Sequence, residues 1–329
     1  MKIIVIGAGV IGSFNAAKLY QAGHEVTLLA RGQRLADLRE HGVVLEHYRT
    51  GARSIARVPL VERLDPDDPY DLAIVTVRRD QIPSVLPMLA RNRRIPSVLF
   101  LGNNAAGADD LVAALGRARV LVGFVNAGGE RRGHVVRYIW SPRLALLFSE
   151  LDGAPTARTD AIVSTFRSAG LRARVYPRVD AYLKTHAVGL PGFAGALYAV
   201  GGDLRRLART PQMLRLFVRS FREGLTALRD LGIPITPWFA TVFEHVPERL
   251  LVLLLSRFFD TELAVVGGQQ HANAAPDEMN EVADELRALF RRAGRPTPAS
   301  DVLMRYVEAR ASSPRAPAEV GVTRPAARG

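Results

Sequence analysis

The hydrophobic pattern of the first part of the chain consists of short apolar runs separated by amphipathic segments. The run KIIVIG at 2–7 is continuously apolar, as expected of a strand covered on both faces, and a helical pattern from 10 to 22 ends at Gly23. This alternation predicts a doubly wound parallel sheet. The other predicted elements are strands at 25–30, 71–77, 97–102, 118–127, 134–140, 143–150 and 172–177 and a helix at 160–170.

The pattern changes at about residue 179, where long helical periodicities begin at 180–200, 211–231 and 277–293. Gly-Pro segments stop two of these helices. We therefore expect an α/β protein: an N-terminal Rossmann-type domain with a doubly wound parallel sheet over 1–178, followed by an all-helical C-terminal domain over 179–312. The tail 313–329, rich in Pro, Ala and Gly, is predicted to be disordered.

Composition narrows the protein class. The chain has 48% hydrophobic and 23% charged residues, which is typical of a globular protein, and it has no cysteine, which excludes disulfides and thiolate chemistry. The apolar N-terminus lacks a cleavage site, and the apolar segment 250–259 is too short to span a membrane. We expect a cytoplasmic protein without a membrane partner. Segment 250–259 either covers a homodimer surface or fills a core.

The net charge of +12 comes almost entirely from arginine. The arginines are scattered, without the interleaved aromatic residues or the recognition helix of a nucleic-acid interface, so we predict no nucleic-acid partner. A basic surface also attracts anionic cofactors and substrates. The His, Asp and Glu residues show no metal-ligand spacing, and we predict no metal site.

A glycine-rich motif stands between the first predicted strand and the first predicted helix. In such a motif the first glycine permits a tight turn, the second lets the backbone approach a pyrophosphate, and the third allows close packing of helix on strand. The strand–turn–helix setting supports a dinucleotide site. Its members are Gly7, Ala8, Gly9, Val10, Ile11 and Gly12.

The end of the second predicted strand indicates which dinucleotide binds. An NAD site places an acidic residue there, whereas this chain reads LARGQR at 29–34. Arg31 and Arg34 are available for a 2′-phosphate, so NADP(H) is the expected cofactor. For Arg34, a plain surface position remains the alternative.

Lysine is rare in this chain and occurs only at Lys2, Lys18 and Lys184. Lys184 lies in an apolar helical run, and lysine, unlike arginine, can exchange a proton near neutral pH. It is therefore a candidate acid, with a junction lysine that reaches solvent as the alternative. His186, two residues further on, points to another helix face and is expected to be structural.

Taken in order, the glycine turn, ARGQR at 30–34, VTVRRDQ at 75–81 and LFLGNNAAG at 99–107 resemble the ketopantoate reductase family. The resemblance covers about residues 1–310. It implies an NADPH-dependent enzyme that reduces the 2-oxo group of ketopantoate on the route of pantothenate biosynthesis.

The resemblance also implies roles for individual residues. Arg78 and Gln81 stand where the family has cofactor-binding residues, and Asn103 and Asn104, after the next strand, are also expected to bind the cofactor. Asn104 stands in the catalytic asparagine position of the family. The catalytic lysine of the family falls on Lys184. A catalytic glutamate falls on Glu278, nineteen residues before Thr297 of the GRPTP segment.

The chemistry of hydride transfer agrees with these assignments. Reduction of a 2-oxo acid places negative charge on the carbonyl oxygen, which an ammonium at Lys184 can stabilise and protonate. Glu278 lies near the start of a predicted helix, at the edge of its apolar face, where it can hold a substrate hydroxyl or orient Lys184. A plain helix N-terminal charge is the alternative for Glu278.

Departures from the family pattern concern the substrate. Where family members commonly carry substrate-contacting asparagines, this chain has Val188 and Gly192, and the segment before Glu278 offers His271 and Asn273 as polar substitutes. A bulkier or more apolar 2-oxo acid than ketopantoate is thus an expected substrate. The alternatives are an opine- or D-2-hydroxyacid-dehydrogenase-like activity and a non-catalytic NADP(H)-binding sensor.

Overall fold

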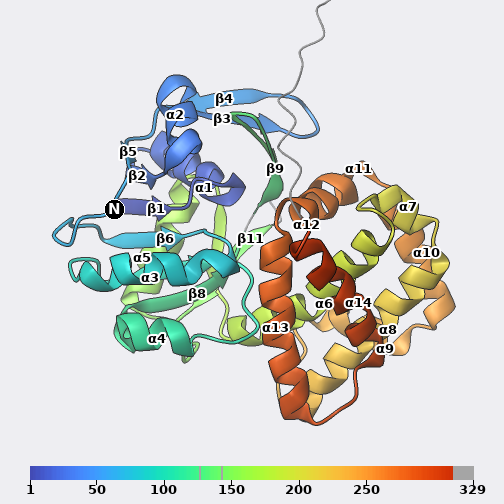
Figure 1. The fold of residues 1–329 in the computed structure, drawn as a ribbon. Helices are drawn as coiled ribbons and strands as arrows, with labels where there is room; N and C mark the ends of the chain where they lie inside the picture. Colours follow the sequence, from blue (N-terminus) through green and yellow to red (C-terminus); the bar gives the residue numbers. More distant parts are fainter. Residues whose placement is uncertain (126, 142–143, 314–329) are drawn as a thin grey trace, which may run out of the picture.

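The computed structural model describes residues 1–125, 127–141 and 144–313. Figure 1 shows two parts that lie side by side: residues 1–178, which contain the strands (the sheet half), and residues 179–313, which contain the long helices (the helical half). Helix α13 (Pro276–Ala293) lies along the border and contacts the turn Arg79–Gln81 of the sheet half. The predicted fold class, a Rossmann-type half followed by a helical half, is confirmed.

The main sheet orders its eight strands β12-β11-β8-β7-β6-β1-β2-β5. All neighbouring pairs are parallel except β11 with β8, so two strands at one edge run opposite to the rest. The strands are β1 (Lys2–Ile6), β2 (Glu25–Leu29), β5 (Leu60–Val61), β6 (Leu72–Val75), β7 (Val98–Leu101), β8 (Val120–Phe124), β11 (Ala145–Ser149) and β12 (Arg172–Val175).

Helices cover both faces of this sheet, which explains its continuously apolar strands. In β1, Ile3 and Val5 pack in one core cluster with Phe14 of α1, while Ile4 and Ile6 join the opposite cluster. The first cluster is covered by α1 (Val10–Gln21) and α5 (Ala157–Ser168), and the second by α3 (Ile82–Arg91) and α4 (Asp109–Leu115). A further helix, α2 (Gly32–His41), follows β2.

A second, four-stranded sheet was not predicted. The strand expected at 134–140 forms, but as β10 (Val135–Ile139) of this separate sheet, in the order β4-β3-β10-β9. Its other strands are β3 (Val43–His47), β4 (Arg53–Ala56) and β9 (Gly128–Arg132). The sheet packs over α1, where the Phe14 and Tyr138 ring centroids lie 5.0 Å apart. Residue 126 of the strand predicted at 118–127 and residue 143 of the strand predicted at 143–150 lie outside the described residues.

The helical half contains the three long helices that the sequence predicts. These are α6 (Val179–Ala199), α8 (Pro211–Asp230) and α13, and α6 packs against α8, α13 and α14. The remaining helices are α7 (Leu204–Ala208), α9 (Val242–His245), α10 (Glu248–Phe259), α11 (Glu262–Ala264), α12 (Gln270–Ala274) and α14 (Pro298–Ala311), with a π-helical turn at Val265–Gln269. Of the predicted tail 313–329, residues 314–329 lie outside the described residues.

One face of helix α10 fills the core of the helical half, and a homodimer surface on its other face stays a prediction. Its Leu251, Val252 and Phe259 are buried, whereas other apolar side chains on it are about half exposed. Within the described ranges, no helix is long and apolar enough to cross a membrane. The exposed apolar side chains of α10 are Leu250, Leu253, Leu254 and Phe258.

Candidate active site

The glycine turn has the geometry that its motif predicts. Gly7 has φ +108°, and a Cβ added to it would lie 3.0 Å from the Val77 amide nitrogen. A Cβ on Gly12 would lie only 1.8 Å from the Gly7 carbonyl oxygen, so α1 packs against the turn at a distance that only glycine permits. Gly9 differs, because a Cβ there would meet no atom of the described residues within 4 Å. The backbone at Gly9 is therefore open to a ligand.

The N-terminus of α1 is suited to bind an anion. Gly9 is its N-cap residue, no described side chain caps it, and its first turn contains no acidic residue. Uncapped N–H groups and the positive end of the helix dipole attract a phosphate. Thr76 Oγ1 supports the turn from β6 by donating to the Gly7 carbonyl at 2.9 Å.

Arg34 has a structural role that the sequence did not indicate. It is only 8% exposed, and its guanidinium donates to the Ala8 and His134 carbonyls at 3.0 and 3.1 Å and to Ser13 Oγ at 3.0 Å. Burial, followed by the charge of Arg131, lowers the pKa of Arg34 to about 10. The interpretation of Arg34 as a plain surface arginine is therefore wrong, because its side chain fixes the backbone of the glycine turn. A contact of Arg34 with a 2′-phosphate stays a prediction.

Arg31 lies where a 2′-phosphate contact was predicted. It follows the end of β2 and is exposed. Among the described residues its side-chain hydrogen bonds are long ones, from Nε to the Glu62 carbonyl at 3.4 Å and from Nη2 to Met88 Sδ at 3.8 Å. Its guanidinium is therefore available to a ligand.

The predicted cofactor residues after β6 lie at the same carboxyl edge of the sheet. Arg78 donates to the Ala274 carbonyl at 3.1 Å and lies 3.5 Å from Asp80, so it contacts the helical half. Gln81 is exposed at the N-cap of α3. The structure brings Arg78 to the border between the halves and leaves Gln81 on the surface.

The loop after β7 separates the two adjacent asparagines. Asn103 Nδ2 donates to Glu278 Oε1 at 3.1 Å, whereas Asn104 makes both of its side-chain hydrogen bonds with the Gly107 backbone, at 2.7 and 2.8 Å. Asn104 thus shapes the loop, and Asn103 reaches the helical half. The catalytic role expected for Asn104 is not tested by this geometry, but the contact with Glu278 belongs to its neighbour.

Glu278 lies in the first turn of α13, faces the sheet half and is 3% exposed. Its Oε1 accepts hydrogen bonds from Asn103 and, at 3.3 Å, from the Arg79 backbone N–H. Its Oε2 has no hydrogen-bond partner among the described residues, and His271 Nε2 lies 3.5 Å away. A buried carboxylate oxygen without a donor is costly, so this oxygen is poised to bind a ligand.

Lys184 lies in the second turn of α6 and is 8% exposed. Its ammonium pairs with Asp180, one turn earlier on the same helix. A Cβ on Gly107 would lie 3.6 Å from Lys184 Nζ, so the amine lies against the loop after β7. The loop 103–107 therefore contacts Glu278 at one end and approaches Lys184 at the other.

The two predicted substrate residues have different surroundings. His271 is exposed and next to Glu278, whereas Asn273 donates to the Gly202 carbonyl at 2.9 Å and packs against that turn within the helical half. Only His271 is thus in contact with the candidate site.

His186 lies on α6 with its ring centroid 4.4 Å from that of Phe124. Burial and then the charge of His271 lower its pKa to about 4, so this side chain is neutral near pH 7.

The positions that replace family asparagines face helix α8. A Cβ on Gly224 of α8 would lie 2.2 Å from Val188 Cγ1, and a Cβ on Gly192 would lie 2.9 Å from Ser220 Oγ. Val188 and Gly192 therefore serve the close packing of α6 on α8. No group of three or more His, Asp or Glu side chains in the described ranges could hold a metal ion.

Three further residues of this region were not predicted. Asp180 could have been found from its spacing, because residues i and i+4 of a helix are neighbours. Arg79 and Glu285 form an ion pair between the halves although they are 206 positions apart in sequence, and no local pattern indicates this contact.

Comparison with known proteins supports the resemblance. A family profile described as "Ketopantoate reductase PanE/ApbA" matches residues 3–142. The "Uncharacterized oxidoreductase YkpB" of Bacillus subtilis is 27% identical over 241 residues, covering 72% of this chain and 78% of its own. A "2-dehydropantoate 2-reductase" of Pyrococcus horikoshii is 24% identical over 78% of this chain and 80% of its own.

The fold is shared with solved structures. The ternary structure of D-mandelate dehydrogenase with NADH and anilino(oxo)acetate superimposes with a TM-score of 0.76 at 18% identity, over 94% of this chain and 98% of that one. These comparisons show a Rossmann-type fold and a similarity to oxidoreductases. Over residues 3–142 the chain is similar to the ketopantoate reductase family, and both relatives are distant in sequence.

Proposed function

We propose that this protein catalyses the NADPH-dependent reduction of a 2-oxo acid to a 2-hydroxy acid. The observation that carries the proposal is the loop 103–107, which contacts Glu278 through Asn103 and approaches Lys184 at Gly107. The loop follows β7 at the carboxyl edge of the sheet, where the glycine turn also lies. Ligands of open α/β sheets bind at that edge.

The residues of the sheet half fit NADPH. The open backbone at Gly9 and the uncapped start of α1 suit a pyrophosphate, and exposed Arg31 suits a 2′-phosphate at a strand end without an acidic residue. Arg78 and Gln81 belong to the same proposed cofactor site. When bound, this cofactor supplies the hydride that the carbonyl carbon receives.

Lys184 is the proposed acid. Its ammonium, paired with Asp180, can donate a hydrogen bond to the substrate's carbonyl oxygen and give it a proton as the carbon is reduced. Solvent then returns the proton to the amine. Burial of the amine strengthens its interaction with the negative charge that develops on the oxygen.

Glu278 is the proposed substrate-orienting group. Asn103 and the Arg79 N–H fix its Oε1, which leaves Oε2 able to accept a hydrogen bond from a substrate hydroxyl. His271, 3.5 Å from Oε2, is the proposed neighbour of the substrate. Asn273, bonded to Gly202, has no role in this proposal.

A second candidate is an opine- or D-2-hydroxyacid-dehydrogenase-like reaction on a bulkier, apolar substrate. It is favoured by Val188 and Gly192, which pack against α8 and offer no amide to a hydroxylated substrate. One of the solved structures with this fold is a D-mandelate dehydrogenase in complex with NADH and anilino(oxo)acetate. Both proposals use the same cofactor site and Lys184, and both place the protein in the cytoplasm. In both, residues 1–178 bind the nucleotide and residues 179–312 bind the substrate.

The proposal is tested by mixing the purified protein with NADPH or NADH and a panel of 2-oxo acids, with and without amines, while cofactor absorbance is followed. Oxidation of NADPH with ketopantoate or another 2-oxo acid supports the reductase, and a requirement for an amine supports the opine reaction. Tight NADPH binding without turnover across the panel contradicts both and supports a sensor.

A further inference from the structure

A pair of buried charged residues joins the two halves behind the candidate site. Glu285, on α13, is 9% exposed as a residue, and the side chain of Arg79, which follows β6, is also 9% exposed. Their side chains form an ion pair from Arg79 Nε to Glu285 Oε1. Burial lowers the pKa of Arg79, but the charges of Glu285 and Asp110 outweigh it and raise the pKa above its ordinary value, so the guanidinium remains charged.

The other oxygen of Glu285 holds the loop after β7. Its Oε2 accepts hydrogen bonds from two consecutive backbone N–H groups, those of Ala105 at 2.7 Å and Ala106 at 3.1 Å. Arg79 continues the network, because its Nη2 donates to Asp110 of α4 at 3.0 Å. One carboxylate of the helical half thus binds both a side chain and the backbone of the sheet half.

These contacts lead directly to the groups of the proposed chemistry. The Arg79 backbone N–H donates to Glu278 Oε1, and the loop that Glu285 holds carries Asn103, the second donor to that oxygen. At its other end, the same loop reaches Lys184 at Gly107. Glu278 and Glu285 are seven residues, about two turns, apart, so both lie on the side of α13 that faces the sheet half.

We propose that Glu285 is a positioning residue for the candidate active site. Through Arg79 and the amides of Ala105 and Ala106, it fixes both donors to Glu278 and the loop beside Lys184, leaving Glu278 Oε2 free for the substrate. The inference rests on the proposed function, in which Glu278 and Lys184 act on a 2-oxo acid.

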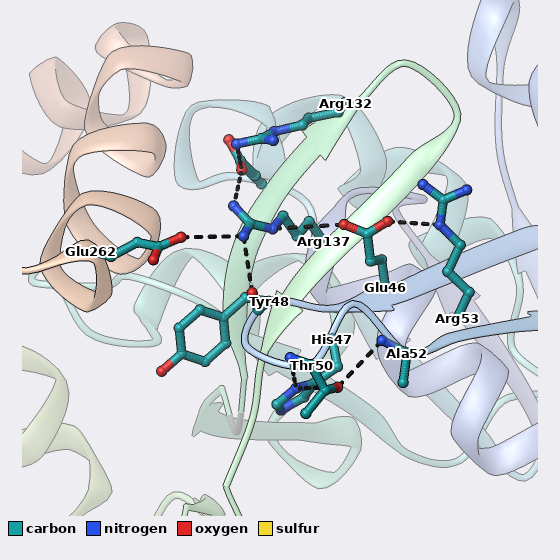
Figure 2. Close-up of polar contacts among 10 residues, drawn as sticks. Glu46, His47, Tyr48, Thr50, Ala52, Arg53, Arg132, Arg137 and Glu262 are labelled. Atoms are coloured by element: carbon teal, nitrogen blue, oxygen red, sulfur yellow. Dashed lines mark hydrogen bonds and ion pairs between the residues drawn. The ribbon is translucent and has the colours of Figure 1, made fainter.

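A second bridge between the halves provides a matched control. Arg137 of β10 lies 3.2 Å from Glu262 of α11 and also contacts Glu130, Glu46 and the Tyr48 carbonyl (Figure 2). The Glu262 side chain is 65% exposed, and among the described residues the contacts of Arg137 do not include Glu278 or Lys184. Removing the Glu262 charge therefore breaks a bridge between the halves without altering the proposed positioning contacts.

The test compares Glu285→Gln with Glu262→Gln in the full chain. In Glu285→Gln the amide NH₂ faces either the Arg79 guanidinium or the backbone N–H groups of Ala105 and Ala106, so one of these contacts becomes repulsive while the side chain keeps its size. We expect the turnover of a 2-oxo acid per NADPH-binding site to fall up to about 100-fold, because a small displacement of a reacting group lowers the rate by about that factor. Glu262→Gln should change it less than about twofold. Arg79→Lys, which keeps the charge, should lose less turnover than Glu285→Gln.

Backbone amide exchange, measured in the same proteins, separates this inference from the proposed function. Glu285→Gln should speed exchange at residues 103–107 and at Arg79, and Glu262→Gln should not. Faster exchange there together with lower turnover per site supports the inference. Unchanged exchange, or unchanged turnover per NADPH-binding site despite faster exchange, overturns it. If the wild-type protein reduces no 2-oxo acid, the proposed function fails, and the exchange measurement alone decides whether Glu285 positions the loop. If Glu285→Gln does not fold, Arg79→Lys is measured in its place.

Discussion

The two halves of the molecule prepare their sites by different physical means. In the sheet half, the glycine turn offers backbone N–H groups and free space to a ligand. Its geometry and this free space require that Gly7, Gly9 and Gly12 carry no side chain. In the helical half, the site depends on buried side chains, Lys184 and Glu278, that partners keep in place. Substitutions in the sheet half should therefore change cofactor binding, and substitutions in the helical half should change turnover.

The largest effect is expected for Lys184→Ala. Loss of the proposed acid should lower kcat by about 10²- to 10⁴-fold, while NADPH binding, which belongs to the sheet half, stays the same. Steady-state kinetics and cofactor fluorescence check the two parts. Lys18→Ala, on α1, is the control and should keep its kcat; an unchanged kcat in Lys184→Ala removes Lys184 from the mechanism.

Two glycine substitutions should distinguish packing from ligand contact within the sheet half. Gly12→Ala places a Cβ 1.8 Å from the Gly7 carbonyl oxygen, so it should lower both Tm and NADPH affinity. Gly9→Ala meets no described atom within 4 Å, so it should leave Tm unchanged and weaken NADPH binding about tenfold or more, equivalent to ~1.4 kcal/mol. Thermal melts and fluorescence titrations measure both. Equal NADPH affinity of Gly9→Ala and wild type contradicts a pyrophosphate at this turn.

The two arginines after β2 should differ in what they affect. Arg31→Ala removes a charged contact to the proposed 2′-phosphate, worth roughly 1.5–3 kcal/mol, so the KM for NADPH should rise about tenfold or more while that for NADH does not change. Arg34→Ala should instead lower Tm, because it releases the Ala8 and Ser13 contacts. Parallel kinetics with both cofactors make the comparison. An equal loss with NADH and NADPH excludes Arg31 as the phosphate ligand.

The smallest effect concerns His186. Its pKa is lowered to about 4 in the folded protein, whereas an unfolded histidine has a pKa near 6.5, so the stability it contributes is complete above pH 6.5 and is lost as the pH falls toward 4. Denaturant titrations at pH 7 and pH 5 should show a steeper decrease for wild type than for His186→Gln. His245→Gln, at an exposed position, should behave as wild type.

The contrast between the halves also explains what the sequence could predict. Glycine turns depend on local backbone geometry, so the turn, the strands of the main sheet except the two-residue β5, and helices α6, α8 and α13 follow from residues near one another in the chain. The roles of Asn103 and Asn104 depend on the path of one loop, and two adjacent asparagines cannot be told apart by pattern. The second sheet, the burial of Arg34 and the Arg79–Glu285 pair join distant segments, and no periodicity indicates such contacts.

The most direct measurement is a crystal structure with NADPH and oxamate, an unreactive analogue of a 2-oxo acid. Our account predicts the pyrophosphate at the N-terminus of α1 and the oxamate carbonyl oxygen about 3 Å from Lys184 Nζ. Oxamate bound elsewhere, or a Lys184 amine that stays out of its reach, would contradict the account.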